Sequence, residues 1–411
     1  MGNRICVVGG GPAGMIAAGT AAMYGAEVTL FEANDRLGKK LSITGKGRCN
    51  VTNFCSVQEF MENVTKNSRF LYSALGALSP EETYSFFEGL GVKLKVERGN
   101  RVFPESDKAK TIVDALVAYC SGATVVNRKV RGIRRDNGTF IVRTDKEEIF
   151  DSVIIATGGR SYPQTGSDGN GYRLAAKLGH TVTPLVPSLI PLTSKDPLCS
   201  SLQGLSLKNV EIKITDLKNK VLYTDFGEMM FTHFGVTGPM ILSASAHLRN
   251  RDISELTLHI DLKPALDEKT LDTRLLNDFK AYANKDFVNS LSSLLPSKLI
   301  EPFVKLTGID GRRKVNGITK EERRTILTTL KDIQIPLSGT RPIEEAIVTS
   351  GGIEVSEVNP GSMESRRTEN LYFAGEILDL DAYTGGFNLQ IAFSTGFLAG
   401  KSAAEKLIGD F

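Results

Sequence analysis

The sequence predicts an α/β fold in which a domain with a parallel sheet, built from both ends of the chain, is split by an insertion. Three observations predict it. A strand–helix–strand pattern with a glycine-rich turn opens the chain at 4–31. Short alternating segments at 128–150, broken by a turn signal, indicate a three-stranded antiparallel meander. After about residue 190 the pattern changes to strands of an antiparallel sheet and then to helices.

The elements follow in order along the first part of the chain. The apolar run 4–8 predicts a strand, the Ala-rich run 13–24 a helix, and 27–31 a second strand. Residues 36–53 are too rich in glycine and lysine for regular structure. Helices are expected near 57–78, at 80–90 and at 109–120, and strands at 123–127 and 152–156.

The second part of the chain carries the insertion and the return to the first domain. Strands are expected at 210–214, 221–224 and 256–260, a mostly helical stretch at 266–328, a buried strand at 370–374 and a final helix at 388–407. We therefore expect three parts. The dinucleotide-binding domain comprises 1–189 and 346–411, the β-rich insertion 190–264 and 330–345, and the helical insertion 265–329.

Composition narrows the class of protein. The 411 residues are 41% hydrophobic and 24% charged with a net charge of +3, which is ordinary for a soluble globular protein. No apolar run reaches the ~20 residues that span a bilayer, and the N-terminus has no signal-peptide pattern, so we expect a cytoplasmic protein without membrane association. The cysteines are odd in number (five) and form no C-x-x-C, and the four histidines lack metal-ligand spacing. We expect no structural metal and no redox-active dithiol.

The glycine-rich turn predicts a phosphate-binding site. It reads Gly9-Gly10-Gly11-Pro12-Ala13-Gly14 and contains G-x-G-x-x-G. The first of the three spaced glycines allows the tight turn, the second lets the backbone approach a pyrophosphate, and the third allows close helix–strand packing. Glu32, at the end of the second strand, is placed to bind a ribose hydroxyl. This context, a strand before and a helix after the turn, indicates a dinucleotide-binding Rossmann unit.

Three further segments indicate FAD instead of NAD. Arg36-x-Gly38-Lys39 after the acidic residue resembles FAD enzymes of the glutathione-reductase type, and so does the Ala-Thr-Gly-Gly run 156–159 after the meander. The C-terminal segment, 371–376 with Asp379 and a Gly-Gly pair, resembles the element that closes over the flavin. The N-terminus of the last helix would then stabilise the anionic reduced flavin. No second G-x-G-x-x-G is present, so NAD(P)H is expected at most as a transient electron donor.

Longer motifs resemble the BaiN-like (YhiN-like, aminoacetone-oxidase-type) flavoproteins. They are the runs 44–53, 158–169, 231–239 and 349–352, which follow in the order of that family. The resemblance implies a glutathione-reductase-type FAD domain with a β-meander, split by an insertion with a β-barrel-like and a helical part. It also implies that the backbone of Val130 contacts adenine. The FAD-binding residues expected from these motifs are Gly9, Gly11, Pro12, Ala13, Gly14, Glu32, Ala33, Arg36, Lys39, Gly45, Arg48, Asn50, Val130, Thr157, Gly158, Gly375, Glu376, Asp379, Gly386, Phe387, Asn388 and Leu389.

The resemblance leaves the reaction open between three functions. Members of this family are linked to reduction of a steroid enone, to formation of dihydrouridine in ribosomal RNA, and to oxidation of aminoacetone. The first two reactions both reduce a C=C bond conjugated to a carbonyl, by hydride transfer from flavin N5 and protonation of the neighbouring carbon. We expect such a reductase; the alternatives are an amine oxidase that releases peroxide and a non-catalytic FAD-binding redox sensor.

Two residues are candidates for the proton donor. Cys49 lies in a basic loop, where Lys46 and Arg48 would lower the pKa of its thiol; the alternative is a small buried filler. His233 is the second candidate, with a purely structural role as the alternative. Tyr162 could serve as a lid or donor, or simply pack in a turn.

The substrate is expected to be a small molecule or an RNA. Basic residues gather at 128–135, at 312–314 and at 323–324, and could neutralise RNA phosphates if they share a face. The alternative is an ordinary solvated surface.

Overall fold

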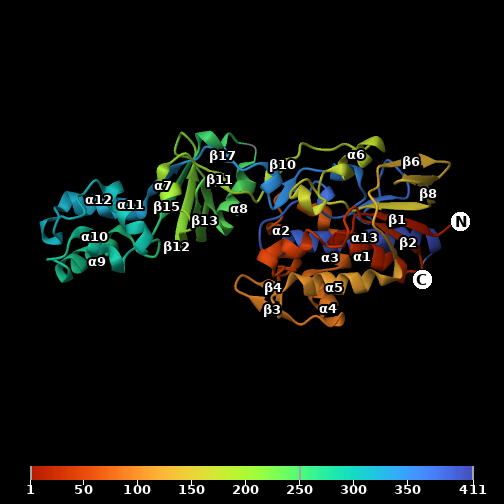
Figure 1. Cartoon of the computed structure of the whole chain (residues 1–411), viewed down its shortest axis with the longest axis horizontal. Helices are drawn as coiled ribbons and strands as arrows, with labels where there is room; N and C mark the ends of the chain where they lie inside the picture. The colour runs from red at the N-terminus through yellow and green to blue at the C-terminus, as the bar shows by residue number, and fades with distance from the viewer. Residues whose placement is uncertain (1, 250, 410–411) are drawn as a thin grey trace. The chain divides into compact units, whose positions relative to one another are not determined.

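The computed structural model describes residues 2–249 and 251–409, which form two compact units (Figure 1). Unit 1 comprises Met1–Ser188 and Pro342–Phe411, and unit 2 comprises Leu189–Arg341. Each unit has its own hydrophobic core.

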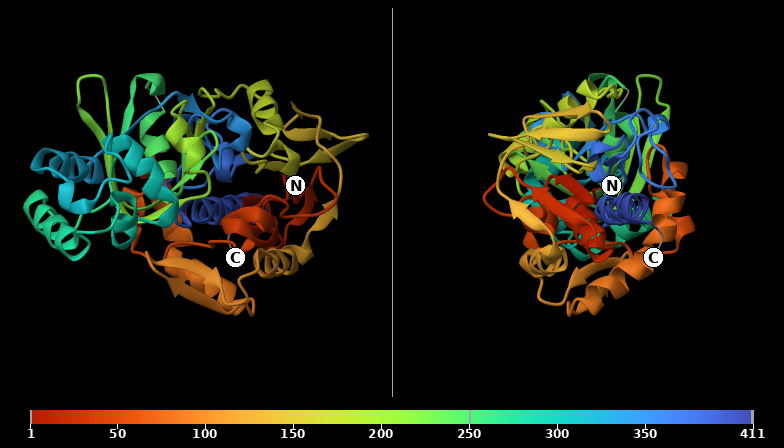
Figure 2. Two further views of the ribbon diagram at one scale, coloured as in Figure 1. Left: turned by 60° about the vertical axis from the view of Figure 1, so that its left-hand side comes forward. Right: turned by 90° about the vertical axis from the view of Figure 1, so that its right-hand side faces the viewer.

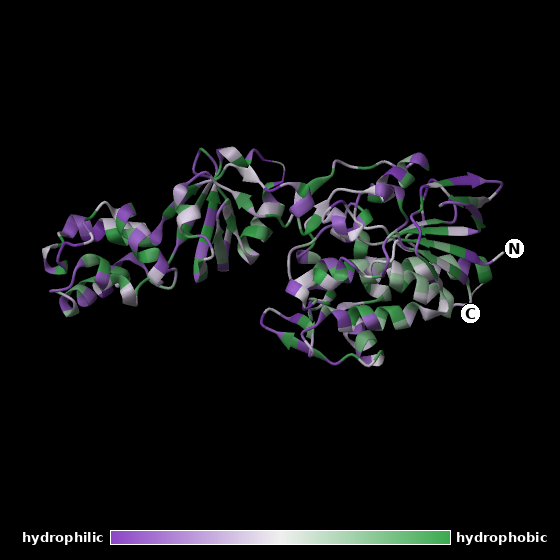
Figure 3. Ribbon diagram, viewed as in Figure 1, coloured by the Kyte–Doolittle hydropathy of each residue, from purple (hydrophilic) through white to green (hydrophobic). Residues whose placement is uncertain are grey.

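Unit 1 is built around a five-stranded parallel sheet with the order β19-β9-β1-β2-β5. The strands are β1 (Arg4–Val8), β2 (Glu27–Phe31), β5 (Thr124–Val126), β9 (Ser152–Ile155) and β19 (Leu371–Phe373). The three central strands and β19 are apolar and almost fully buried, as in a sheet covered on both faces (Figure 3). Because all five strands run the same way, the loops that follow them gather at one edge. The fold class predicted from the sequence is confirmed.

Two helices from opposite ends of the chain pack closely against each other beside this sheet (Figure 2). They are α1 (Pro12–Met23) and α13 (Phe387–Ile408). A Cβ added at Gly396 would lie 2.4 Å from the Ala13 carbonyl oxygen, and one at Gly400 would lie 2.4 Å from that of Ala17. The small residues in the last helix therefore allow the two backbones to approach each other.

The other elements of unit 1 surround this centre. The predicted meander forms an antiparallel sheet of β6 (Gly132–Asp136), β7 (Thr139–Arg143) and β8 (Glu147–Phe150). The remaining elements are α2 (Val57–Glu62), α3 (Tyr72–Ala77), α4 (Pro80–Gly89), the hairpin β3 (Leu94–Glu97) and β4 (Arg101–Pro104), α5 (Ala109–Tyr119), α6 (Asn170–Lys177) and the pair β10 (Val186–Ser188) and β18 (Val348–Ser350).

The helix expected at 57–78 is interrupted, and this part of the prediction is wrong. Asn67 adopts a left-handed conformation (φ +56°), which ends a right-handed helix. The Thr65 amide donates a hydrogen bond to the Asp381 carbonyl, 2.9 Å away, instead of continuing a helix. This long-range contact leaves no periodic trace in the sequence.

Unit 2 contains a seven-stranded sheet and a helical segment. The sheet order is β16-β15-β12-β13-β14-β11-β17, and its strands are β11 (Leu192–Thr193), β12 (Ser206–Thr215), β13 (Val221–Thr232), β14 (Gly235–Thr237), β15 (Thr257–Asp261), β16 (Ile333–Pro336) and β17 (Gly339–Thr340). The helices are α7 (Pro197–Ser201), α8 (Pro239–Leu248), α9 (Glu268–Ala281), α10 (Phe287–Ser290), α11 (Ser297–Thr307) and α12 (Lys320–Lys331). Pro296 lies at the N-cap and Gly308 at the C-cap of α11, and these two residues separate it from the neighbouring helices.

A buried histidine in unit 1 makes folding sensitive to pH. His180 is 4% exposed; its Nε2 lies 2.8 Å from the Ser365 hydroxyl and its ring meets Phe373 edge-on. Burial lowers its pKa, and the Glu357 carboxylate, 3.2 Å from Nδ1, opposes this only in part. The unfolded state therefore binds a proton at a higher pH than the folded state, and stability falls as the pH drops below about 6.5.

We expect His180→Gln to flatten this dependence. The wild-type protein should lose up to ~1.4 kcal/mol of stability per pH unit from this one group below about pH 6.5, and the variant should not. The measurement is thermal unfolding between neutral pH and about pH 5 for both proteins. Equal slopes would assign the acid sensitivity to other groups.

Candidate functional site

The glycine-rich turn connects β1 to α1 as the sequence predicts. Gly9 has φ +106°, and a Cβ there would lie 2.6 Å from the Ala156 carbonyl oxygen. A Cβ on Gly14 would lie 1.8 Å from the Gly9 carbonyl oxygen, so both positions exclude any side chain. At Gly11, by contrast, no atom lies within 4 Å of an added Cβ. The turn thus leaves open space beside Gly11, at the N-terminus of α1, where a phosphate group fits.

Glu32 lies at the end of β2, beside the same turn. Its carboxylate accepts hydrogen bonds from the Gly10 amide at 2.7 Å and from the Asn34 amide at 2.7 Å, and it is 8% exposed. The carboxylate is therefore fixed next to the glycine turn. This is the position from which an acidic side chain binds a ribose in Rossmann folds.

The loops after β9 and β19 meet at the same edge of the sheet. Glu376 accepts a hydrogen bond from the Thr349 amide at 2.9 Å and forms an ion pair with Lys40 Nζ at 2.9 Å. Lys40 also donates to the Ser161 hydroxyl at 2.7 Å. Lys40 thereby ties together three loops distant in the sequence. The sequence predicted its neighbour Lys39, whose Nζ lies 3.3 Å from the Asn34 side-chain oxygen.

Three of the six buried side-chain polar atoms that lack a hydrogen-bond partner in the described part of the chain belong to predicted cofactor-binding residues. Within the described part of the chain, Asn50 Oδ1, Thr157 Oγ1 and Asp379 Oδ1 are buried and make no hydrogen bond. Buried polar groups are nearly always hydrogen-bonded, so these atoms indicate a place for a polar ligand. Asp379 is 1% exposed, and its other oxygen is held by Lys66, which the sequence analysis did not single out. With the open space at Gly11, these residues fit a bound dinucleotide.

The N-terminus of α13 begins at the predicted glycine pair. Gly386 has φ +100°, and a Cβ there would lie 2.4 Å from the Thr52 carbonyl oxygen. Phe387 is buried and packs edge-on against Phe60. The Asn388 side chain bonds to both backbone groups of Ala382, at 2.9 and 2.7 Å, and so fixes the loop before the helix. Leu389 is partly buried against the core of unit 1.

The segment 41–49 has an unusual backbone, and its cysteine does not fit the predicted chemistry. Cys49 adopts a left-handed conformation (φ +61°) and is 0% exposed. Burial raises the pKa of its thiol to about 12. The expectation that Lys46 and Arg48 lower this pKa is wrong, because desolvation dominates and the Arg48 charge is bound to carboxylates.

We expect Cys49 to resist alkylation in the folded protein. A thiol that is both inaccessible and protonated at neutral pH reacts slowly with iodoacetamide, since the thiolate is the nucleophile. Peptide mass spectrometry should find Cys49 unmodified under native conditions and modified after denaturation in guanidinium. Fast native labelling of Cys49 would contradict the buried position and restore it as a proton donor.

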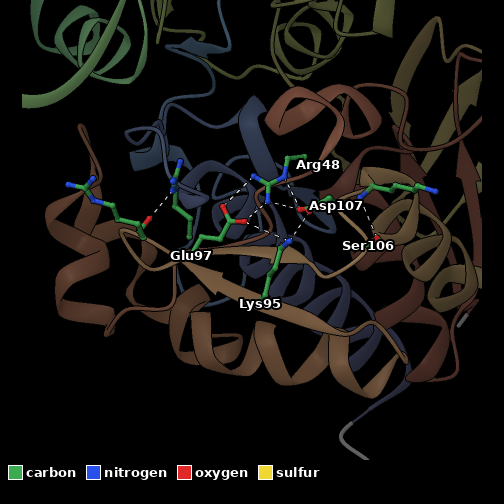
Figure 4. Close-up of polar contacts among 8 residues, drawn as sticks. Arg48, Lys95, Glu97, Ser106 and Asp107 are labelled. Atoms are coloured by element: carbon green, nitrogen blue, oxygen red, sulfur yellow. Dashed lines mark hydrogen bonds and ion pairs between the residues drawn. The ribbon is translucent and has the colours of Figure 1, made fainter. Parts of the chain in front are cut away.

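Arg48 belongs to a cluster of ion pairs between the segment 41–49 and the β3–β4 hairpin (Figure 4). Its guanidinium binds the Glu97 carboxylate and also that of Asp107, with Nε 2.8 Å from Asp107 Oδ1. Lys95 binds Asp107 at 2.7 Å, and the Arg48 guanidinium lies 4.1 Å from the centre of the Phe103 ring. The Arg48 guanidinium is thus bound by Glu97 on β3 and by Asp107 after β4, so its predicted contact with FAD stays a prediction.

The remaining residues predicted to bind FAD lie in several different loops of unit 1. Ala33 and Arg36 are exposed beyond β2. Gly45 has φ +56°, and a Cβ there would lie 3.1 Å from the Asn50 amide. The Val130 carbonyl accepts a hydrogen bond from Asn170 at 2.9 Å. Gly158 has φ +71°. Gly375 has φ +78°, a Cβ added there would lie 2.8 Å from Ala13 Cβ, and its amide donates a hydrogen bond to the Thr395 hydroxyl.

The second proton-donor candidate lies in unit 2. His233 is exposed in the two-residue turn between β13 and β14, and its ring packs against Phe234. Tyr162, in unit 1, has φ +53° and donates its amide to the Glu344 carbonyl at 3.0 Å. The proposed roles of His233 as a proton donor and of Tyr162 as a lid or donor therefore stay predictions.

Much of the basic cluster at 128–135 is neutralised. Arg128 pairs with Asp145, Lys129 with Asp168, Arg134 with Glu147 and Arg135 with Glu369. Such a surface attracts RNA less than the sequence alone indicates. Among the described residues, no helix is long and apolar enough to cross a membrane, and no group of three acidic, His or Cys side chains could hold a metal ion.

Comparisons with known proteins agree with this geometry. Residues 3–402 match the family described as the HI0933-like protein Rossmann domain. The chain is 32% identical to the 3-dehydro-bile acid delta(4,6)-reductase of Clostridium scindens, over 98% of this chain and 100% of that protein. It is 29% identical to the ribosomal RNA dihydrouridine synthase of Escherichia coli, over 95% of each. Among solved structures, the 3-ketosteroid delta1-dehydrogenase of Sterolibacterium denitrificans shares the fold, with a TM-score of 0.54, 13% identity, and coverage of 98% of this chain and 100% of that one.

Proposed function

Because this chain belongs to the HI0933-like Rossmann domain family, we propose that it is an FAD-dependent oxidoreductase that reduces a C=C bond conjugated to a carbonyl. The observation that carries the proposal is the similarity, along the full length of both proteins, to a bile acid delta(4,6)-reductase. The relative named as a ribosomal RNA dihydrouridine synthase supports the same reaction type, because the C5=C6 bond of uracil is also conjugated to a carbonyl. Bound FAD supplies the hydride, through its N5 atom.

The residues of unit 1 would bind FAD at the carboxyl edge of the parallel sheet. The amides at the start of α1 and the open space beside Gly11 favour the pyrophosphate. Glu32 would hold the ribose next to them. Asn50, Thr157 and Asp379 would direct their unpartnered oxygens to polar groups of the cofactor, since nothing else in the described chain satisfies them.

The last helix and the loops in front of it would orient the reactive end. The N-terminus of α13 carries a partial positive charge, which stabilises negative charge that develops nearby. The Lys40–Glu376 pair, each side chain about one-fifth exposed, fixes the loops on either side. We assign the proton donor to a group other than Cys49, with His233 as the first residue to test, because a thiol with a pKa of about 12 is a weak acid at neutral pH.

The test is reoxidation of the reduced holoprotein in the absence of oxygen. The flavin is reduced chemically, and its visible absorbance is followed after addition of a 3-keto-4,6-diene bile acid or of unmodified ribosomal RNA. Rapid recovery of the absorbance with either acceptor, together with a saturated product by mass spectrometry, is the expected result. Reduction of the oxidised flavin by aminoacetone, with peroxide release and no reaction with either acceptor, would replace this proposal by an amine oxidase.

A further inference from the structure

A buried carboxylate at the carboxyl edge of the parallel sheet of unit 1 depends on one lysine for its counter-charge. Asp379 is 1% exposed, and its Oδ1 atom makes no hydrogen bond within the described chain. Its Oδ2 atom accepts a hydrogen bond from Lys66, which forms the only ion pair of Asp379 among the described residues. A buried charge is costly unless it is paired and hydrogen-bonded, so the Lys66 ammonium offsets the cost of burying this carboxylate.

The segment that carries this lysine, between α2 and α3, is fixed along the loop before α13. The Thr65 amide and hydroxyl both donate to the Asp381 carbonyl, each at 2.9 Å. On the other side of the lysine, the Asn67 side chain donates to the Asp379 carbonyl at 2.8 Å. The backbone of Lys66 is therefore held from both sides. Its ammonium meets a fixed carboxylate, although the side chain of the lysine is 43% exposed.

The sheet order places Asp379 and Glu32 on opposite sides of the glycine turn. Glu32 follows β2, the turn follows β1, and Asp379 belongs to the loop after β19. In the order β19-β9-β1-β2 the strands before the two carboxylates are three spacings apart, about 14 Å. A dinucleotide with its pyrophosphate beside Gly11 and its adenosine ribose on Glu32 extends its other half, the flavin half, toward Asp379. A carboxylate only accepts hydrogen bonds, so Oδ1 matches a hydroxyl or N–H donor of that half and not a phosphate.

We propose that Lys66 is a positioning residue for the flavin half of FAD and that it acts through Asp379. Its ammonium holds one carboxylate oxygen and so directs the other, unpartnered oxygen to a donor group of the cofactor. The inference rests on the proposed function only in requiring bound FAD. Without the ammonium the carboxylate is buried with no counter-charge and its orientation is no longer fixed. The adenosine half, on the other side of the glycine turn, keeps its contacts.

The experiment compares the affinities of the full-length apoprotein for FAD and for ADP, which contains the adenosine half and two phosphates but no flavin. FAD binding is followed by quenching of flavin fluorescence, and ADP binding by isothermal titration calorimetry. The variant K66Q removes the counter-charge, and K66R retains it. The matched control, R69Q, removes a nearby exposed charge that forms no ion pair within the described residues.

We expect K66Q to bind FAD roughly tenfold more weakly or worse and to bind ADP like wild type, because a charged hydrogen-bond partner is lost on one side of the site only. K66R and R69Q should bind both ligands like wild type. An unchanged FAD affinity in K66Q, or equal losses of affinity for FAD and ADP, would overturn the inference.

A second comparison uses D379N, which lacks the carboxylate charge. K66Q added to D379N should change FAD binding little, and a further large loss would show that Lys66 acts elsewhere and would overturn the inference. This pair of variants also carries the test if K66Q alone does not accumulate as a folded protein. No substrate enters the titrations, so failure of both acceptors to reoxidise the flavin would reject the reductase and leave the role of Lys66 in place. Reoxidation by K66Q with unchanged FAD affinity would reject that role and leave the reductase.

Discussion

Gly11→Ala is expected to leave the fold intact and to weaken FAD binding roughly tenfold or more, whereas Gly14→Ala is expected to disrupt the fold itself. Gly11 has φ −78° and ψ −176°, which any residue adopts, and an added Cβ meets no atom of the protein within 4 Å. The methyl group would instead occupy the space where the backbone must approach a pyrophosphate. At Gly14 the added Cβ would lie 1.8 Å from a carbonyl oxygen, so the strand and helix must separate, at a cost of about 3 kcal/mol or more.

The two variants are compared by thermal unfolding of the apoproteins and by titration with FAD, followed through quenching of flavin fluorescence. The apoprotein of Gly11→Ala should unfold at the wild-type temperature and bind FAD weakly. Gly14→Ala should unfold at a clearly lower temperature or fail to accumulate. Wild-type FAD affinity in Gly11→Ala would place the cofactor phosphates elsewhere and would remove the main geometric support for the cofactor site.

The fold was predictable where local patterns carry the information. The buried strands β1, β2 and β9 are short apolar runs next to glycines, and α13 is a long run of small and apolar residues, so periodicity and turn chemistry suffice. The β3–β4 hairpin and α6 were not predicted. The break between α2 and α3 was missed because it depends on contacts with residues more than 300 positions away, which no local window contains.

The motifs of the candidate site could be predicted from the sequence, whereas the contacts between distant segments could not. The glycine turn and Glu32 follow from spacing, because the Rossmann turn is a local structure. Lys40, and not the predicted Lys39, contacts Glu376 and Ser161. These two partners lie far from Lys40 in the sequence, so no local motif indicates which of the two lysines joins the loops. The expected low pKa of Cys49 was wrong for a related reason. Its neighbours in the sequence suggest a basic environment, but the fold buries the thiol and pairs Arg48 with Glu97.

Gln390→Leu is expected to cause the second large effect, a loss of about 3 kcal/mol or more of stability together with weaker FAD binding. Gln390 is 0% exposed on α13 and its amide group holds three separate segments together. The Thr52 hydroxyl donates to Oε1 at 2.6 Å, and Nε2 lies 2.7 Å from the Thr83 hydroxyl and 3.0 Å from the Leu78 carbonyl oxygen. Leucine has a similar size but no hydrogen-bonding groups, so it leaves the buried Thr52 and Thr83 hydroxyls without this partner, and each such loss costs about 1–3 kcal/mol. The Leu78 carbonyl keeps the hydrogen bond that the Ser394 hydroxyl donates at 2.7 Å.

The same network explains why the change should reach the cofactor. Thr52 lies two residues after Asn50, and its backbone packs against Gly386 at the start of α13. Release of Thr52 would therefore loosen both the loop that carries the unpartnered Asn50 oxygen and the N-terminus of α13, which is proposed to orient the reactive end of the cofactor. Gln334→Leu, the same substitution at an exposed position on β16, is the control and should change stability little. If Gln390→Leu unfolded at the wild-type temperature and bound FAD normally, the buried network would not be what positions α13, and the small residues packed on α1 would have to do so alone.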